Sequence, residues 1–314
     1  MAKGRALVTG GAGFVGAHLV KRLLKEGYDV NVIDNLSRNV NHVEELAQSG
    51  QINFLKGDIR ERAHIEKIME GCDYVFHLAA VCINRCKAFP TEAIEVNLNG
   101  SFNVFGAAIN HNIKKLLFTS TSSVFGQPEY LPMDEKMSKK AAEPYGATKY
   151  CAEQMLEFLS KKHGLPYIIV RPFNVYGPYQ STDAYYTSVI NVFIKNLIAG
   201  KPPRIDGSGE QSMDFTHVDD LVDAYIKLLE APVVNEDFNV APGQDVSIRQ
   251  LAETIIREMK LNIEPTYIPR EVLVTKRRCD NSKLKKHISH EFKVTIDVGV
   301  RDLINHVRDN FDKY

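Results

Sequence analysis

A glycine-rich turn between an apolar strand and an amphipathic helix constrains this chain most. Residues 5–9 form an apolar run typical of a buried strand, and residues 14–24 carry apolar side chains at helical spacing. Between them, Gly11, Gly13 and Gly16 have the spacing that permits a tight turn, close approach of a pyrophosphate and packing of the helix on the strand. Unpaired N–H groups at the start of such a helix favour an anion. The pattern predicts a dinucleotide-binding unit, and the alternative is a turn that binds nothing.

A carboxylate at the end of the second strand indicates which dinucleotide binds. Residues 29–34 read as a strand that ends in Asp34, at about the interval where an acidic side chain accepts hydrogen bonds from the adenosine ribose. This carboxylate would repel a 2′-phosphate, so we predict NAD. Arg38, just beyond, leaves NADP as the alternative, because an arginine can bind that phosphate.

A tyrosine and a lysine four residues apart indicate the chemistry. Tyr145 and Lys149 would share one face of a helix over residues 145–162. A nearby ammonium favours the ionised phenol, which would make Tyr145 a base, and Lys149 would also hydrogen-bond the nicotinamide ribose. The same spacing occurs on ordinary solvated helix faces, so its meaning depends on the glycine turn. Together the two patterns predict redox chemistry on an alcohol.

Composition excludes several other classes of protein. The 39 basic side chains balance the 39 acidic ones, so we expect no nucleic-acid partner. The apolar runs are too short to span a membrane, and the chain begins without a signal-peptide pattern, so we expect a cytoplasmic protein with no membrane partner. No paired metal spacing is present, and we predict no metal site and reduced thiols at Cys72, Cys82, Cys86, Cys151 and Cys279.

Strand-like and helix-like segments alternate through the first half of the chain. The expected strands cover residues 5–9, 29–34, 52–56, 74–77, 116–120 and 167–171, and the expected helices residues 14–24, 62–70, 91–110 and 145–162. This alternation predicts an α/β fold, a Rossmann-type doubly wound parallel sheet with a smaller α/β substrate-binding lobe. We expect the NAD-binding domain to cover residues 1–172 with returning segments near 214–242. The lobe would comprise residues 173–213, with a helix over 189–199, and residues 243–314.

Six motifs occur in order along the chain, at residues 7–16, 34–37, 77–80, 118–126, 144–149 and 171–177. Together they resemble the extended short-chain dehydrogenase/reductase superfamily, and within it the NAD-dependent nucleotide-sugar epimerase/dehydratase family. The resemblance covers nearly the whole chain. It implies a nucleotide-diphosphate sugar as substrate, and a homodimer formed through the helices at residues 91–110 and 145–162.

The resemblance also assigns roles to individual residues. It makes Tyr145 the base, Lys149 its activator and Thr121 the hydroxyl that hydrogen-bonds the reacting sugar oxygen. Asp58 would reach the adenine amino group. For Ala79 and Ala80, the alternative to a cofactor contact is ordinary tight packing. For Asn97, the alternative is a hydrogen bond between two helices. Besides Tyr145 and Lys149, the expected cofactor contacts are Gly10, Gly13, Phe14, Val15, Gly16, Asp34, Asn35, Asp58, Ile59, Leu78, Ala79, Ala80 and Asn97.

The residues after Thr121 bear on the reaction. Family 4,6-dehydratases resemble Thr-Asp-Glu at this point, whereas this chain has Thr121, Ser122 and Ser123. A serine hydroxyl is a poor acid or base near neutral pH, which argues against ordinary elimination. We therefore predict a 4-epimerase that acts through a transient 4-keto sugar. A dehydratase on the same scaffold is one alternative, and a non-catalytic NAD-binding interaction protein is another.

Substrate contacts are expected at Cys82, Thr121, Ser122, Ser123, Asn174, Arg204 and Arg278. The family usually has a diphosphate-binding arginine where this chain has Met213, which cannot neutralise a diphosphate. Arg204, Arg277 or Arg278 would have to compensate. Residues 179–182 replace an arginine-rich stretch of the family's glucuronate epimerases. We therefore predict a neutral UDP-hexose or UDP-N-acetylhexosamine.

Two cysteines stand in the loop that the resemblance brings near the sugar. A thiol at Cys82 or Cys86 would act as an acid or base if Arg85 or Lys87 lowered its pKa, which would favour an unusual dehydratase or an epimerase that acts at a second centre. The more ordinary role of such a cysteine is that of a small buried apolar side chain.

Overall fold

The computed structural model describes residues 2–38, 41–180, 188–269 and 275–310. The chain divides into two compact units. The first contains Met1–Gly126, Lys139–Arg171 and Val222–Phe238, and the second contains Gln127–Ser138, Pro172–Leu221 and Asn239–Tyr314. The expected division differs in two places: the segment Gln127–Ser138 clusters with the second unit, and the returning segment of the first unit is Val222–Phe238.

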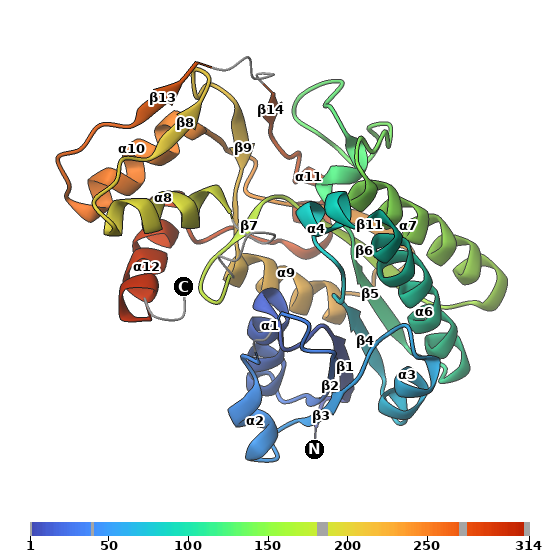
Figure 1. The fold of residues 1–314 in the computed structure, drawn as a ribbon. Coiled ribbons are helices and arrows are strands. Elements are labelled where there is room, and N and C mark those ends of the chain that lie inside the picture. Colours follow the sequence, from blue (N-terminus) through green and yellow to red (C-terminus); the bar gives the residue numbers. More distant parts are fainter. Residues whose placement is uncertain (1, 39–40, 181–187, 270–274, 311–314) are drawn as a thin grey trace. The chain divides into compact units, whose positions relative to one another are not determined.

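The first unit is built on a seven-stranded sheet, which confirms the predicted fold class (Figure 1). From β3 to β6, each strand pairs in parallel with its neighbour. Central strands are buried on both faces, which is why they read as nearly continuous apolar runs. The order is β11 (Glu236–Val240), β6 (Tyr167–Pro172), β5 (Lys115–Thr119), β4 (Tyr74–His77), β1 (Arg5–Thr9), β2 (Asp29–Asp34) and β3 (Asn53–Lys56).

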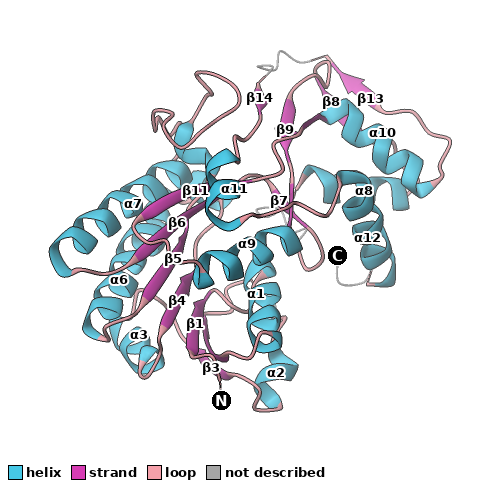
Figure 2. Cartoon of the chain, turned by 180° about the vertical axis from the view of Figure 1, so that it is seen from behind, coloured by secondary structure: helices cyan, strands magenta, loops and turns pink. Residues whose placement is uncertain are grey.

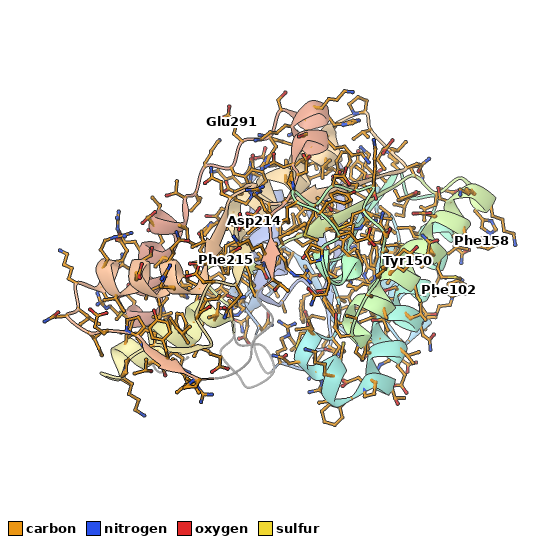
Figure 3. The ribbon with its side chains drawn as sticks, turned by 90° about the horizontal axis from the view of Figure 1, so that it is seen from above. Phe102, Tyr150, Phe158, Asp214, Phe215 and Glu291 are labelled. Carbon is orange, nitrogen blue, oxygen red and sulfur yellow. The ribbon has the colours of Figure 1, made fainter. Side chains whose placement is uncertain are left out.

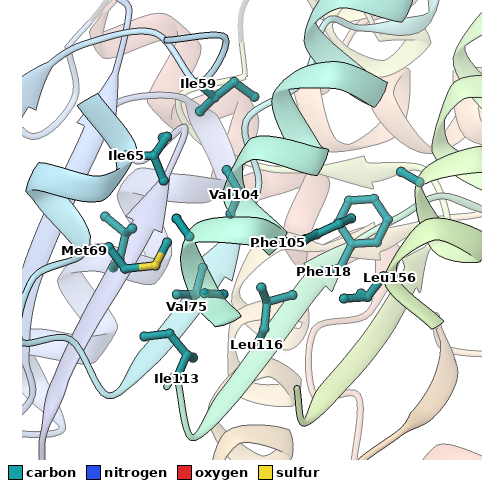
Figure 4. Packing of buried hydrophobic residues seen from close by; sticks show 14 of the residues in the cluster. Ile59, Ile65, Met69, Val75, Val104, Phe105, Ile113, Leu116, Phe118 and Leu156 are labelled. Atoms are coloured by element: carbon teal, nitrogen blue, oxygen red, sulfur yellow. The ribbon is translucent and has the colours of Figure 1, made fainter. Parts of the chain in front are cut away.

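Helices cover both faces of this sheet (Figures 1 and 2). On one face lie α1 (Phe14–Lys25) and the part of α9 (Val218–Glu230) that belongs to this unit, joined by an ion pair of 2.9 Å between Arg22 and Asp223. On the other face lie α3 (Arg62–Met69), α6 (Ser101–Asn110) and α7 (Pro144–His163), over the apolar core shown in Figure 4. The short helix α2 (Glu44–Gln48) precedes β3.

Two local structures differ from the expectation. The helix expected over residues 91–110 is a succession of α5 (Pro90–Ala93), a π-helix η1 (Ile94–Gly100) and α6. The expected loop around Cys82 and Cys86 contains a short helix, α4 (Ile83–Ala88). A π-helix accommodates an extra residue in an otherwise α-helical run and is frequent near functional sites.

The second unit has its own apolar core, formed where α8 (Val189–Ile198), α10 (Ile248–Met259) and α12 (Ile296–Asp309) pack together. Among the described residues, three small sheets accompany them. The first contains β12 (Asp245–Ser247), β9 (Ser212–Asp214) and β14 (Lys276–Arg277), the second β10 (Thr216–His217) and β7 (Val175–Tyr176), and the third β13 (Thr266–Ile268) and β8 (Arg204–Asp206). The helix α11 (Ser282–Ile288) follows β14. Within the described residues, no helix has the length and apolar character needed to cross a membrane.

Candidate active site

The glycine turn joins β1 to α1 with no room for side chains at its closest approach. The Gly10 amide donates to the Ile33 carbonyl at 2.8 Å, which ties the turn to β2. A Cβ at Gly16 would lie only 2.2 Å from the Gly10 carbonyl oxygen. Since backbone atoms would have to move to relieve that overlap, glycine is required where the helix packs on the turn.

The start of α1 is suited to an anion. Gly13 is its N-cap, and no side chain in the described part of the chain caps the helix. Phe14 and Val15 follow and are only partly buried. The first N–H groups of a helix and its dipole favour negative charge, so this helix start fits the pyrophosphate of a dinucleotide.

Asp34 links the end of β2 to the glycine turn. Its carboxylate accepts hydrogen bonds from the Ala12 amide at 3.1 Å and from the Leu36 amide at 2.8 Å. Burial raises the pKa of Asp34, and the two amides partly oppose that shift. The carboxylate therefore stands beside the turn, where it fits the expected acceptor for the ribose of NAD.

The Asp58 carboxylate interacts with two neighbouring side chains, Asn35 and Arg60. It accepts from the Asn35 amide at 3.0 Å and forms an ion pair of 2.8 Å with Arg60. The hydrogen-bonded Arg60 guanidinium lowers the pKa of Asp58 to about 2. Sequence reasoning missed Arg60, although its position two residues after Asp58 was a usable signal. The adjacent Ile59 is buried.

A buried hydrogen-bond relay runs from the end of β1 to the π-helix. The Thr9 hydroxyl lies 2.7 Å from His77 Nδ1, and His77 Nε2 lies 2.8 Å from the Ser101 hydroxyl. Ser101 donates to the Asn97 carbonyl at 2.6 Å, so His77 must carry its proton on Nε2 and accept from Thr9. The Thr9 oxygen in turn accepts from the amides of Leu78 and Ala79, which fixes the backbone directly after β4.

Asn97 acts on the protein backbone. Its side-chain oxygen accepts from the Val81 amide at 2.7 Å, and its nitrogen donates to the Val81 carbonyl at 3.2 Å. The same nitrogen lies 3.4 Å from the Thr148 hydroxyl on α7. The bond to α7 is a helix–helix hydrogen bond of the kind that the sequence left open as the alternative, and the cofactor contact of Asn97 stays a prediction.

The helix that carries Tyr145 begins tightly against the hydroxyl-rich turn. The Glu143 carboxylate caps α7 by accepting from the amides of Tyr145 and Gly146, each at 2.8 Å. A Cβ at Gly146 would lie 2.6 Å from the Ser123 carbonyl oxygen. The absence of that carbon brings the first turn of α7 next to the turn that holds Thr121.

Thr121, Ser122 and Ser123 form the start of the 3-10 helix η2 (Ser122–Phe125). The Thr121 hydroxyl accepts from the Ser123 amide at 3.1 Å, which leaves its proton available for donation. Thr121 and Ser122 are buried, whereas Ser123 is partly exposed. Ser122 and Ser123 supply only hydroxyl groups, so the turn itself has no carboxylate for elimination.

Burial dominates the electrostatics of Tyr145 and Lys149. Burial lowers the pKa of Lys149 to about 7, and Glu153 partly offsets this. Burial raises the pKa of Tyr145, as do the nearby Cys86, Cys82 and Glu143, whereas Arg38 lowers it. Burial is the largest cause of both shifts, and the activation of the phenol by Lys149 stays a prediction.

Cys86 is a structural residue. It is fully buried, and its thiol donates a hydrogen bond to the Val81 carbonyl at 3.3 Å. Burial raises the pKa of this thiol to about 12. Such a thiol stays protonated at neutral pH, so the acid–base hypothesis is wrong for Cys86. Cys82, the N-cap of α4, is only partly buried.

The expected substrate residues of the second unit have partners of their own. The Asn174 amide donates to the Asp214 carbonyl at 2.9 Å. Arg204 is 63% exposed and pairs with Asp206 on its own strand at 3.2 Å. Arg278 Nη1 lies 3.9 Å from Asp245.

In the parallel pairing of β14 with β9, Arg277 stands opposite Met213, so it is Arg277 that shares a face with the methionine. Residues 181 and 182 of the expected neutral stretch lie outside the described residues.

Comparison with known proteins decides the family. The model of the NAD dependent epimerase/dehydratase family matches residues 6–241. The chain belongs to this NAD-dependent epimerase/dehydratase family. It is therefore an enzyme that uses NAD, and the glycine turn, the start of α1 and Asp34 are the parts of this family member that fit the cofactor.

Several proteins are similar to this epimerase/dehydratase over nearly their whole length. A putative UDP-glucose 4-epimerase of Methanocaldococcus jannaschii is 33% identical, with 97% of this chain and 98% of the relative covered. A UDP-N-acetyl-alpha-D-glucosaminuronate decarboxylase of Bacillus cytotoxicus is 31% identical, with 98% of each covered. The crystal structure of UDP-glucose 4-epimerase from Thermotoga maritima with UDP-glucose matches with a TM-score of 0.91, 32% identity, and 98% and 99% coverage.

Proposed function

We propose that this protein is a nucleotide-sugar 4-epimerase. The observation that carries the proposal is the close packing of Gly146 on Ser123, which sets Tyr145 beside a turn that offers Thr121 but no carboxylate. The similarity to UDP-glucose 4-epimerases supports the same reaction. Because a decarboxylase is similar to this chain as well, the proposal depends on the chemistry of the turn rather than on overall similarity.

Three side chains carry the proposed reaction. Tyr145 takes the proton from the sugar O4 hydroxyl and returns it after the sugar has turned over. The Thr121 hydroxyl, whose proton is not used by the Ser123 amide, donates to the same oxygen and orients it. Lys149, in its charged form, stabilises the ionised Tyr145 phenol. Bound NAD supplies the reversible oxidation of the sugar alcohol.

The proposed substrate is a UDP-hexose or a UDP-N-acetylhexosamine. A neutral sugar is favoured because this chain lacks an arginine-rich stretch after residues 176–178, where the family's glucuronate epimerases have one. For the diphosphate, Arg277 is the candidate to replace the arginine missing at Met213, because the two residues stand opposite each other on adjacent strands. This assignment refines the sequence-based choice among Arg204, Arg277 and Arg278.

We also propose a homodimer through α6 and α7. Phe102 on α6 is 43% exposed and Phe158 on α7 is 56% exposed. Figure 3 shows both rings on the outer side of their helices. Large aromatic side chains on one exposed face are typical of protein interfaces.

The direct test follows the sugar itself. The purified protein would be incubated in deuterated water with UDP-glucose, UDP-N-acetylglucosamine and UDP-glucuronate in turn, and the products followed by NMR. Inversion at C4 without deuterium in the sugar is the expected result. Loss of water with deuterium entering the sugar would establish a dehydratase and overturn the proposal.

A further inference from the structure

The Lys149 ammonium lies over the face of a buried aromatic ring. Its nitrogen is 4.6 Å from the centroid of the Phe118 ring, within the range of a cation–π interaction. Phe118 is on β5 and is fully buried. Phe118 is the first residue of the motif at residues 118–126, and it has no role in the expected site or in the proposed reaction.

The other groups around Lys149 compensate its burial poorly. On its own helix, Glu153 accepts two hydrogen bonds from Arg171 and one from Ser120, so it acts on Lys149 only from a distance. On α4, Cys86 is a protonated thiol. Tyr145 precedes Lys149 by one turn. The Phe118 ring, by comparison, meets the ammonium directly with its face.

The remaining neighbour is His77, on β4. It stands opposite Phe118 in the strand pairing, and the two rings stack with centroids 5.5 Å apart at 23°. Burial and Lys149 both lower the pKa of His77 well below its usual value. The neutral imidazole is held by Thr9 and Ser101, so it adds no positive charge beside Lys149.

We propose that Phe118 is a positioning residue for the reaction, and that its ring face holds the Lys149 ammonium beside Tyr145 and favours the charged form. The inference rests on the proposed role of Lys149. The electron-rich face of the ring replaces part of the hydration that the ammonium loses on burial, which an aliphatic side chain cannot do. Phe118 thereby acts on the reaction through Lys149 and touches no substrate.

Ring fluorination tests the proposal with little change in shape. Phe118 would be replaced by 4-fluoro-, 3,5-difluoro- and 3,4,5-trifluorophenylalanine, which weaken the negative ring face stepwise. The pKa of Lys149 would be followed by NMR of 13Cε-labelled lysine in the NAD-free protein, with the resonance assigned from Lys149→Met. We expect the pKa to fall with each step, by about one pH unit in total.

Phe105 offers a matched control position. Its ring meets Phe118 edge to face at 5.4 Å in the same core (Figure 4). The same analogues at Phe105 should leave the Lys149 pKa unchanged. The proposal would be overturned if the pKa of Lys149 did not change on fluorination of Phe118, or if fluorination of Phe105 changed it equally.

A conventional variant extends the test to turnover. Phe118→Leu should move the alkaline limb of the pH–rate profile to lower pH by about one unit, whereas Phe105→Leu should leave it in place. Urea unfolding of both variants would establish that each is folded. Because the NMR titration needs no turnover, its outcome stays separate from any failure of the proposed 4-epimerase activity.

Discussion

Arg171 and Glu153 form a two-point ion pair inside the first unit, with Nε–Oε1 and Nη2–Oε2 distances of 2.8 and 2.7 Å. Both side chains are at most 2% exposed. The pair joins the end of β6 to the middle of α7, one turn beyond Lys149. It thereby holds the helix that carries the proposed base, and it keeps the charge of Glu153 largely neutralised beside Lys149.

Removal of Arg171 should destabilise the fold strongly. Arg171→Met leaves the buried Glu153 carboxylate without its charged partner, and we expect a loss of about 3–5 kcal/mol in the free energy of unfolding in urea. Arg62→Met is the control, because its ion pair with Glu66 is on the surface and is 54% exposed on the arginine side. The control should lose less than about 1 kcal/mol. Equal losses in the two variants would show that the buried ion pair contributes no more to stability than the surface pair.

Tyr145→Phe should separate chemistry from cofactor binding. We expect kcat to fall by about 10²–10⁴-fold, because the proton acceptor is lost, while the affinity for NAD stays within about threefold. Steady-state kinetics and a fluorescence titration with NAD measure the two quantities. Tyr150→Phe, on the same helix, should retain activity. Simultaneous loss of turnover and NAD binding in Tyr145→Phe would point to a structural role for Tyr145.

Gly146→Ala should impair turnover through geometry. The added carbon would lie 2.6 Å from the Ser123 carbonyl oxygen, so the start of α7 must shift away from Thr121. A displacement of this kind costs about 10²-fold in kcat. Gly106→Ala on α6 meets its nearest atom at 3.8 Å and should leave kcat unchanged. A fully active Gly146→Ala would contradict the proposed juxtaposition of Tyr145 with the turn.

The buried lysine should make stability depend on pH. The pKa of Lys149 is about 7 in the folded protein, lowered by burial from 10.5. Between these values the unfolded chain binds a proton that the folded chain does not, so stability rises with pH. Relative to Lys149→Met, the wild type should gain about 1.4 kcal/mol per pH unit across this window, measured by urea unfolding. A flat difference would show that Lys149 titrates normally in the folded state.

The proposed dimer can be tested on its two exposed aromatics. Phe102→Glu combined with Phe158→Glu should give a monomer in sedimentation experiments, since burying two new charges is unfavourable. Leu261→Glu, at a residue of the second unit that is 39% exposed, is the control and should leave the oligomeric state as it is. Dimerisation that survives the double substitution would exclude this face.

Much of the fold was predictable from local patterns. The strands at residues 5–9, 29–34 and 74–77 have the expected bounds, because each contains β-branched or other apolar residues and ends at a turn or a polar residue. The π-helix was not predictable, since its seven residues are too few to distinguish its wider period from that of an α-helix. The helix α4 is only six residues long, too short for a periodicity to stand out.

The site was predictable in its residue types but not in its electrostatics. The glycine turn, Asp34 and the Tyr145–Lys149 spacing are patterns along the chain. Burial is a property of the folded state, however, and it raises the pKa of Tyr145 where the spacing alone suggested the opposite. The placement of Arg277 opposite Met213 depends on pairing between strands more than 60 residues apart, which no local pattern specifies.

The contact between Gly146 and Ser123 makes the position of Tyr145 independent of the side chains that the turn carries. It involves a missing side chain on one partner and a backbone oxygen on the other, so the side chains of Ser122 and Ser123 can be exchanged without disturbing it. New acids or bases can therefore be introduced into the turn while Tyr145 keeps its place. A scaffold of this kind allows the step that follows oxidation to change while the oxidation itself is retained.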